Sequence, residues 1–412
     1  MRRAEIIFVL LGTSLGACSS EDPCEGVSGT CVALTEGASA EEVQTAMIEV
    51  APGGTLAFGE GTFSFEVDLS LDVDNVTIRG AGQDKTTLSF ARQTTGAQGI
   101  LVTGDAFTIQ DIGIEDSPGD ALKILGSDGV TIQRVRVEWT AGPKETNGAY
   151  GLYPVQCKNV LIEDSIVEGA SDAGIYVGQS ERIVVRNNVA RNNVAGIEIE
   201  NSSQADVTGN TATANTGGVL VFNLPGLQVE NGHGTRVYAN EIFENNTPNF
   251  APVGNIVGSV PTGTGIALLA AHGVEIFDNQ IRDHLSINIG IISYAPIGVP
   301  NDPSYDMYST AIHIHDNRLS GTSDTPTGRL GALLISALSE LMPNGPFIVP
   351  DLVWDGAIDA ARAGSAADRI CIHDNGDADY INLEWPLTGA PKATRDLAPH
   401  ACSHAALPAV QL

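Results

Sequence analysis

The fold is decided by residues 158–223, which repeat one pattern three times: KNVLIEDSIVEGASDAGIYVGQS, ERIVVRNNVARNNVAGIEIENS and SQADVTGNTATANTGGVLVFN. Val160, Ile183 and Ala205 hold the same position, so the repeat is 23 and then 22 residues long. This period is too short for a helix and a strand with turns, but it suits about three short strands and three bends. It predicts one coil of a parallel β-helix per copy, and each coil is stable only when stacked on its neighbours.

The repeat continues on both sides of these copies. Residues 129–135 fit the first strand of a coil, residues 75–80 and 107–112 fit it more loosely, and similar runs follow downstream. Stacked side-chain amides can hydrogen-bond from coil to coil, whereas Asn residues scattered in surface loops would not recur at one register. We therefore predict an all-β chain, a right-handed parallel β-helix, with a structural ladder formed by Asn188, Asn210, Asn240, Asn279, Asn317 and Asn375.

The N-terminus resembles a bacterial lipoprotein signal. Two Arg residues precede a short apolar run at 6–11, and small residues then lead to Cys18. The run is too short to span a bilayer. We expect residues 1–17 to be removed and Cys18 to be lipidated at the cell envelope, where Ser19 and Ser20 favour the outer membrane. An ordinary secretory signal is the alternative, and it also exports the chain.

Three segments follow from this interpretation: a signal at 1–17, a tether at 18–35 and the β-helix domain at 36–412, whose C-terminal region is irregular. Ser39 and Glu42 form a capping-box pattern, and apolar residues follow at helical spacing. We expect a helix at 39–50 that covers the first coil, because an exposed strand edge invites aggregation.

Export makes disulfides possible for the remaining cysteines. Cys24 and Cys31 are close together in a segment without a core of its own, so they are expected to pair. Cys371 and Cys402 could tie the C-terminal tail to the last recognisable coil. Cys157 is interpreted as a small buried thiol.

The chain is strongly acidic, with 50 Asp and Glu against 21 Lys and Arg and a formal net charge of −29. Such a surface repels phosphate backbones, which excludes nucleic acid as a general partner. It also disfavours long polyanionic glycans unless a local basic patch or a bound cation intervenes.

Extra residues gather on both sides of the third strand of the coil. They precede it at 139–147 and 247–263, and they follow it at 225–234 and 295–309. Long loops in a compact fold usually carry function. We expect them to wall a cleft on one face of the solenoid, floored by this strand. Residues 328–338 are interpreted as the same strand one coil later, although a short amphipathic helix is the alternative.

Outward side chains of the third strand define the floor of this cleft. Lys123, Tyr153, Tyr176 and Glu198 would form one column at the coil spacing of about 4.8 Å, with Glu200 on the same face. The candidate catalytic residues are Glu198, Glu200, Tyr176 and Lys123. The candidate substrate-binding residues are Tyr153, Tyr176, Phe222 and Trp139.

Two kinds of chemistry fit this column. Two carboxylates could flank a glycosidic bond as acid and base or nucleophile. Alternatively, a Tyr or Lys could remove the proton beside a uronate carboxylate. Solvated glutamates on an outward face are the plain alternative. The Tyr rings favour stacking on sugar, since they present flat apolar faces with a polar tip.

Three histidines also occupy matching outward positions: His313, His315 and His373. A His-x-His pair on a strand places both imidazoles on one face, where they could hold a metal. However, Cys371 matches His313 in register, and a disulfide there would leave little room. We therefore assign no metal site and no cofactor. A bound calcium ion would have no motif to support it.

Four phrases, NGAYGLYPVQC, SDAGIYVGQS, NVAGIEIENS and TPNFAPVGNIV, resemble bacterial envelope proteins described as parallel β-helix repeat-containing. The resemblance covers roughly residues 75–317 and implies a fold and an exported location, but no reaction. More loosely, the architecture is similar to that of pectate lyases, polygalacturonases and alginate epimerases. The Asp-Pro-His-Asp signature of the epimerases and the clustered Asp ligands of calcium-dependent pectate lyases are absent, so no mechanism is carried over.

Two functional hypotheses follow. The first is an exported, lipid-anchored protein that acts on or binds polysaccharide in the cleft, as a lyase or hydrolase. The second is a non-catalytic envelope lipoprotein that binds a glycan or a protein partner through the same cleft. In both, the lipid provides the only contact with the membrane.

Overall fold

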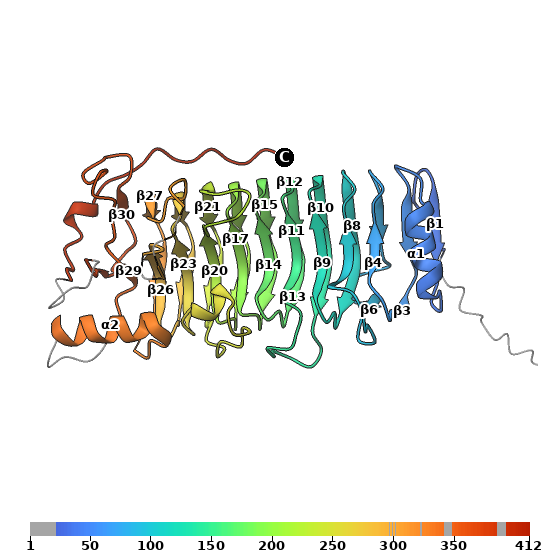
Figure 1. Ribbon diagram of the computed structural model, residues 1–412, viewed down its shortest axis with the longest axis horizontal. Helices are drawn as coiled ribbons and strands as arrows, with labels where there is room; N and C mark the ends of the chain where they lie inside the picture. The colour runs from blue at the N-terminus through green and yellow to red at the C-terminus, as the bar shows by residue number, and fades with distance from the viewer. Residues whose placement is uncertain are drawn as a thin grey trace, which may run out of the picture.

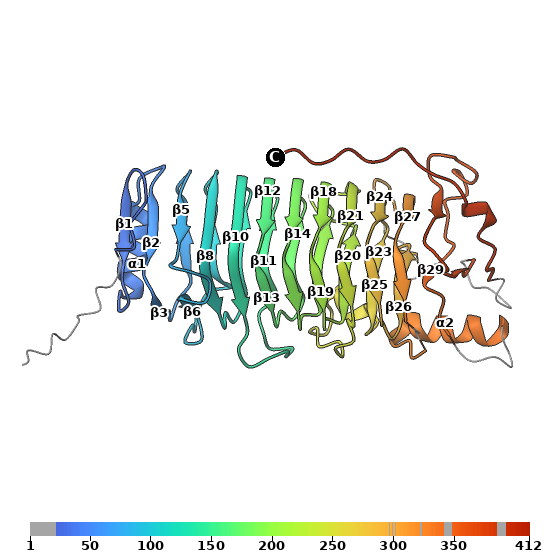
Figure 2. The same ribbon diagram turned by 180° about the vertical axis from the view of Figure 1, so that it is seen from behind.

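The computed structural model is a long solenoid of parallel strands (Figures 1 and 2). It describes residues 22–295, 297–298, 300, 302–321, 324–341, 348–384 and 393–412. The expected signal at 1–17 and the lipidation site Cys18 lie outside the described residues. The fold is therefore all-β and a right-handed parallel β-helix, as the repeat predicts.

The strands form two sheets. Sheet A has 20 strands: β1 (Cys31–Leu34), β2 (Thr55–Phe58), β3 (Gly61–Ser64), β5 (Thr77–Arg79), β6 (Thr86–Ser89), β8 (Phe107–Glu115), β10 (Asp128–Glu138), β12 (Lys158–Glu163), β13 (Ile166–Glu168), β15 (Glu181–Arg186), β16 (Val189–Arg191), β18 (Ser203–Thr208), β19 (Thr211–Thr213), β21 (His233–Tyr238), β22 (Glu241–Phe243), β24 (His272–Phe277), β25 (Gln280–Arg282), β27 (Thr310–His315), β28 (Arg318–Ser320) and β30 (Ile370–His373).

Sheet B has 11 strands and contains the third strand of each coil: β4 (Leu69–Leu71), β7 (Gln98–Val102), β9 (Asp120–Leu125), β11 (Tyr150–Val155), β14 (Ala173–Gly178), β17 (Ala195–Glu200), β20 (Gly217–Phe222), β23 (Thr264–Leu269), β26 (Ile287–Ile292), β29 (Leu352–Trp354) and β31 (Tyr380–Asn382). Four helices accompany the sheets in the described residues: α1 (Ala40–Glu49), η1 (Ile256–Ser259), α2 (Gly328–Leu341) and η2 (Ala398–His400).

The register of the coils is the register of the sequence repeat. Val160 lies opposite Ile183, and Ile183 lies opposite Ala205, on β12, β15 and β18. All three side chains are buried in the core that runs along the inside of the solenoid. Because a slip of one residue would turn each strand inside out, this apolar column fixes how the coils stack.

The Asn ladder runs through six coils. The side-chain oxygen of Asn210 accepts hydrogen bonds from the backbone N–H and the Nδ2 of Asn188, at 2.9 and 3.0 Å. The same pair of bonds links Asn210 to Asn240, and it is repeated through Asn279, Asn317 and Asn375. Each of the six side chains is buried. These side-chain amides therefore provide hydrogen-bond partners for buried backbone N–H groups at one corner of the solenoid.

A second ladder, which we did not predict, runs through the next bend of the coil. Asn193 donates to the side-chain oxygen of Asn215, and Asn215 donates to that of Asn245. Nδ2 of Asn245 lies 3.1 Å from Nε2 of His284, which ends the ladder. His284 is buried there, and burial lowers its pKa to about 4, so the ring is neutral and can accept this bond.

The N-terminal end is closed as the capping box predicts. The Ser39 side chain accepts from the backbone N–H of Glu42, and the Glu42 carboxylate accepts from that of Ser39. Val43 and Met47 of α1 are buried on the first coils. The expected tether at 18–35 needs correction, because residues 31–34 form β1 and pair with β2. A disulfide joins Cys24 to Cys31 and fixes this strand, as the sequence suggests.

The interpretation of residues 328–338 as a strand is wrong, because they belong to helix α2. Leu334 and Leu338 are one helical turn apart and buried, while Ile335 is exposed, so the Leu and Ile spacing serves a helix face. The strand that follows β26 in sheet B is β29. Within the described residues, no helix has the length and apolar character needed to cross a membrane.

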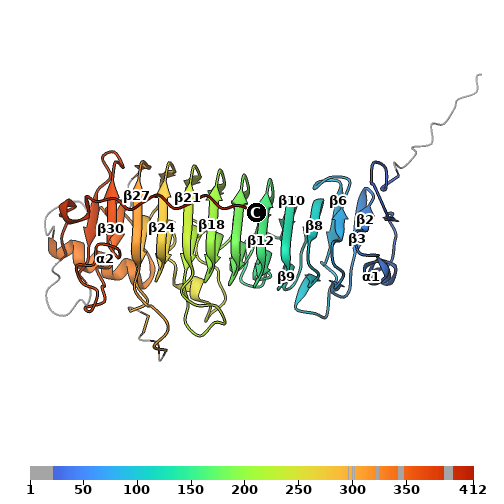
Figure 3. The same cartoon turned by 90° about the horizontal axis from the view of Figure 1, so that it is seen from above.

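The C-terminal tail returns along the outside of sheet A (Figure 3). A disulfide joins Cys402 to Cys371 on β30, which is the second pairing expected from the sequence. Beyond it, the backbone N–H of Leu407 donates to Glu275 on β24, and that of Val410 donates to Asp206 on β18. The tail thus crosses several coils and covers acidic side chains of the sheet.

Candidate functional site

The outer face of sheet B carries a column of aromatic and acidic side chains. Tyr153 on β11 lies beside Tyr176 on β14, with ring centroids 4.9 Å apart, and Tyr176 lies opposite Glu198 on β17. Lys123 lies opposite Tyr153, and its Nζ is 4.8 Å from the centre of the Tyr153 ring. Strand alternation therefore places these four residues outside the solenoid core, on one face.

This face is covered, and the expectation of an open cleft over it is corrected. Only 4% of Tyr176 and 1% of Glu198 is exposed, and Glu200 and Phe222 are also buried. The cover is the loop at 247–263, whose η1 residue Val257 packs with Tyr176 and Phe222 in one apolar cluster. In this state a sugar cannot stack on Tyr176 or Phe222.

Trp139 does not belong to the site. Its indole lies in the core of the solenoid, and its Nε1 donates to the backbone oxygen of Ser117 at 2.6 Å. The loop at 139–147 starts from this buried anchor, so the ring stabilises the base of the loop and is not exposed to solvent. An indole with a hydrogen-bonding edge can serve either role in a sequence, and only packing separates them.

Tyr150 is a member of the site that the sequence reasoning missed. Its ring centroid lies 4.4 Å from that of Tyr153 and 4.6 Å from that of Tyr176, so the three rings form one cluster. Its hydroxyl oxygen lies 3.4 Å from Oδ2 of Asp172. Tyr150 and Tyr153 are three positions apart, which strict alternation assigns to opposite faces, so the pattern gave no signal for this contact.

Asp172 and Asp120 were also missed. Asp172 directly precedes β14 and is buried, and the loop residue Asn255 donates to its Oδ2 at 2.9 Å. Asp120 begins β9 and is partly exposed. The sequence held one signal for both residues: each is an acidic residue at the start of a third strand, on the side where the long loop at 247–263 arises.

The carboxyl groups of the site have raised pKa values. Burial, with the nearby charge of Glu200, raises the pKa of Asp172 to about 7, and burial raises that of Asp120 to about 6. The pKa of Glu198 is raised well above its usual range by burial and by Glu200 and Asp172. Neither oxygen of Glu198 has a hydrogen-bond partner among the described residues. Burial therefore favours the protonated form of Glu198 in the closed state, which makes it a poor candidate for a base.

Glu200 is held by Tyr176, whose hydroxyl donates to Oε1 at 2.7 Å. Burial raises the pKa of Glu200, although this hydrogen bond opposes the rise. The described residues that could together ligate a metal, Glu275, His313 and His315, are on sheet A and not in this site. The site thus offers hydrogen-bonding and proton-transfer groups: Lys123, Tyr153, Asp120, Tyr150 and Asp172.

A separate cavity of about 510 Å³ lies at the C-terminal end of the solenoid, lined by Trp354, Arg362 and His400 among others. Arg362 also pairs with Asp306 from the loop that follows β26, at 2.7 Å. The lining of this cavity includes none of the residues of the column on sheet B.

A comparison with family models agrees with the fold. The family model described as "Right handed beta helix region" matches residues 69–232. A comparison with the curated proteins finds no match. Similar solved structures include the A-module of a mannuronan C-5 epimerase from Azotobacter vinelandii, at 22% identity and a TM-score of 0.49, covering 70% of this chain and 85% of that one.

Two further solved structures are similar over comparable lengths. One is a pectate lyase, at 10% identity and a TM-score of 0.41, with 74% of this chain and 78% of that chain covered. The other is a family 28 exopolygalacturonase of Yersinia enterocolitica, at 12% identity and a TM-score of 0.40, with 73% and 67% covered. At these identities the likeness concerns the fold alone.

Proposed function

We propose that this right-handed β-helix protein acts on a polysaccharide that lies across the coils on the outer face of sheet B. The observation that carries the proposal is the pair of carboxyl groups, Asp172 and Asp120, whose pKa values are raised to about 7 and about 6 beside Tyr150. General acid–base catalysis is most effective when the pKa of the group lies near the working pH. Perturbed carboxyls also gather at functional sites more than elsewhere.

The chemistry would be a proton transfer at a sugar ring. Asp172 is in contact with the Tyr150 hydroxyl, so the two could pass a proton between the buried carboxyl and a substrate bound over the Tyr rings. Lys123 supplies a positive charge beside Tyr153, which suits the carboxylate of a uronic acid residue. These groups fit a lyase, which removes the proton beside that carboxylate. A hydrolase would use the same carboxyls to protonate the leaving oxygen.

Substrate access requires that the loop at 247–263 moves. The loop is held by the hydrogen bond from Asn255 to Asp172 and by apolar packing of Val257 and Val260. A substrate that competes for Asp172 would remove the polar part of this contact. Lids that close over a site exclude water and complete the catalytic arrangement.

A non-catalytic binding function is the second candidate. It is favoured by the hydrogen bond between Tyr176 and Glu200 and by the burial of Glu198, which keep these groups away from a substrate in this state. The end formed by Lys123, Tyr153, Asp120 and Tyr150 is partly exposed. A glycan or a protein partner could bind there without any reaction.

The test is a glycan-binding array combined with assays for new reducing ends and for unsaturated uronate products. It uses chain lacking residues 1–18, its Asp172→Asn variant and a control variant, Asp278→Asn, at an exposed turn of sheet A. Turnover that is lost in Asp172→Asn and kept in Asp278→Asn supports the enzyme. Binding without turnover supports the second candidate, and the absence of both overturns the proposal.

We also propose that the protein is exported and anchored through a lipid on Cys18. The support is the arrangement of residues 1–18 and the presence of two disulfides, Cys24–Cys31 and Cys371–Cys402. Disulfides persist in oxidising compartments and are rare in the cytosol. A polysaccharide of the cell surface or its surroundings would be within reach of such a protein.

A further inference from the structure

A cluster of imidazoles and one carboxylate lies on the outer face of sheet A, far along the solenoid from β9. Glu275 on β24 lies opposite His313 on β27, and His315 lies opposite His373 on β30. Nε2 of His315 is 3.2 Å from Oε1 of Glu275, and Nδ1 of His313 is 3.8 Å from the same oxygen. Ligand atoms of Glu275, His313 and His315 all lie within 4.8 Å of one another.

The hydrogen bonds around His313 determine which of its nitrogens is free. Nδ1 of His373 lies 2.9 Å from Oδ2 of Asp374, so it carries the proton that this carboxylate accepts. In the neutral His373 ring Nε2 then has a lone pair, and it lies 2.9 Å from Nε2 of His313, which donates to it. Nδ1 of neutral His313 is left with a lone pair directed toward Glu275.

The same reasoning applies to His315. Its Nδ1 lies 2.8 Å from Oδ2 of Asp316, so Nδ1 carries a proton, and in the neutral ring Nε2 presents a lone pair to Glu275. Metal-binding histidines commonly donate their second ring N–H to a carboxylate in this way. Two nitrogen lone pairs and one carboxylate oxygen therefore face one point with no donor between them.

Burial makes this arrangement costly without a positive charge. Glu275 is 4% exposed and His313 is 6% exposed. Nδ1 of His313 is buried and has no hydrogen-bond partner among the described residues.

We propose that Glu275, His313 and His315 form a binding site for a divalent transition metal ion of the zinc type. Two imidazoles and a carboxylate are a ligand set that zinc accepts. Ligand atoms about 2.0–2.1 Å from a tetrahedral zinc ion lie roughly 3.3 Å apart, which is close to the separations of Glu275 Oε1 from both rings. His373 and the two aspartates would orient the ligands.

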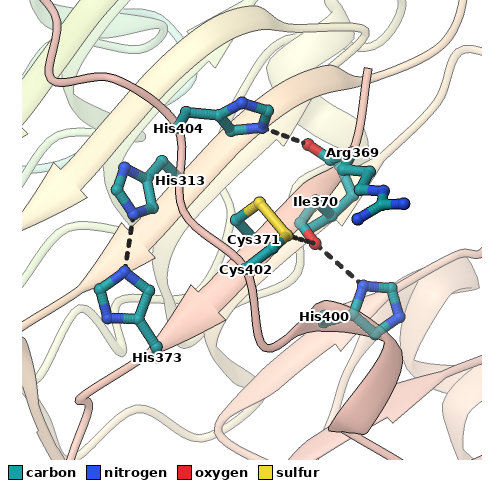
Figure 4. Close-up of a disulfide and its surroundings, with 8 residues drawn as sticks. All are labelled: His313, Arg369, Ile370, Cys371, His373, His400, Cys402 and His404. Carbon is teal, nitrogen blue, oxygen red and sulfur yellow. Dashed lines mark hydrogen bonds between the residues drawn. A yellow bond between two sulfur atoms is a disulfide. The ribbon is translucent and has the colours of Figure 1, made fainter. Parts of the chain in front are cut away.

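The site also holds the C-terminal tail. The second oxygen of Glu275 accepts from the backbone N–H of Leu407 at 2.9 Å. The disulfide between Cys371 and Cys402 starts the tail beside His313 and His373 (Figure 4), and His404 faces His313 with ring centroids 6.0 Å apart. The disulfide therefore leaves the histidines together, contrary to the expectation that it would leave little room. A bound ion would fix Glu275 and with it the path of the tail.

The test uses the full chain purified without a polyhistidine tag and stripped with a chelator. Isothermal titration with Zn²⁺ should show one site per chain. Replacement by Co²⁺ should give the absorption bands of a tetrahedral cobalt ion with nitrogen and oxygen ligands. His315→Gln and Glu275→Gln should each weaken Zn²⁺ binding by about 10-fold to 100-fold. His233→Gln, a change at the start of β21, should leave binding unchanged.

The folded state of each variant is checked by circular dichroism and by its melting temperature without metal. If one variant does not fold, the other variant and the wild-type Co²⁺ spectrum together still decide the proposal, because the spectrum reports the type and geometry of the ligands. Absence of that spectrum, or equal Zn²⁺ affinity in wild type, His315→Gln and Glu275→Gln, overturns the site. The Glu275 carboxylate would then be balanced by a proton on His315.

Discussion

Tyr176 reaches across one coil to Glu200, and its hydroxyl donates to Oε1 at 2.7 Å. The residue that lies opposite Glu200 in the sheet is Gly178, and a Cβ there would lie 2.3 Å from the Tyr176 hydroxyl. Gly178 therefore leaves the space through which the Tyr176 ring passes. The contact links β14 to β17 on the face proposed to bind polysaccharide.

Tyr176→Phe should destabilise the protein by about 1–3 kcal/mol, because it removes the hydrogen bond and leaves a buried carboxyl without its donor. Urea unfolding of the variant and of Tyr238→Phe, a half-buried Tyr on sheet A, measures the difference. If the free energy of unfolding falls by the same small amount in both variants, the hydrogen bond from Tyr176 to Glu200 contributes nothing to stability.

Asn210→Leu should destabilise by about 2–4 kcal/mol, since both buried donors of Asn188 lose their acceptor and the Asn240 oxygen loses one of its two donors. The control is Thr208→Leu, on the outer side of β18 just before Asn210, and its expected change in the free energy of unfolding is within about 0.5 kcal/mol. Thermal unfolding of the two variants decides. Equal melting temperatures would show that the ladder is not a source of stability.

The raised pKa of Asp172 predicts how stability changes with pH. The folded protein holds a proton on this carboxyl up to about pH 7, whereas the unfolded chain releases it near pH 4, at the usual value of 3.8. The free energy by which this proton stabilises the folded state is fully present below about pH 4 and is lost as the pH rises to about 7. Urea unfolding from pH 4.5 to 7.5 should show that decline. The decline in the free energy of unfolding with pH should be flatter in Asp172→Asn and unchanged in Asp278→Asn. An unaltered slope in Asp172→Asn would contradict the raised pKa of Asp172.

Tyr153→Ala should weaken binding of the polysaccharide by about 1 kcal/mol or more through lost stacking on the ring. Tyr153 is chosen because it is partly exposed, whereas Tyr176 is covered by the loop at 247–263. Affinity is measured by titration with the glycan found in the array, with Tyr238→Ala on sheet A as control. An equal loss in both variants would place the binding surface elsewhere.

Cys18→Ser should abolish fatty-acid labelling and should release the protein from the membrane fraction. The physical reason is that Cys18 is the proposed attachment point of the lipid, and the described residues include no helix able to cross a membrane. Labelled fatty acid and fractionation of cells that produce the wild type, Cys18→Ser and Ser20→Ala test this. A labelled, membrane-bound Cys18→Ser protein would rule out the anchor.

The sequence alone determined the repeating architecture. Val160, Ile183 and Ala205 share an apolar position, and Asn188 and Asn210 share a polar one, so one short period specifies both the core and the ladder. Local rules also sufficed for α1, because the Ser39 capping box depends on residues three positions apart. The cysteine pairs followed from their places in the chain and from the expected export.

Tertiary structure alone decided the state of the functional face. Strand alternation assigned Tyr176 and Glu198 to the outside of the solenoid. Their burial depends on the loop at 247–263, which folds back over earlier coils, and its residue Asn255 contacts Asp172, 83 residues earlier. The contact of the Tyr150 and Tyr176 rings depends on the packing of neighbouring coils. On sheet A, Glu275, His313 and His315 meet only because successive coils place distant segments side by side. Side-chain periodicity gives the direction in which a residue points, whereas burial and pKa depend on what packs against it.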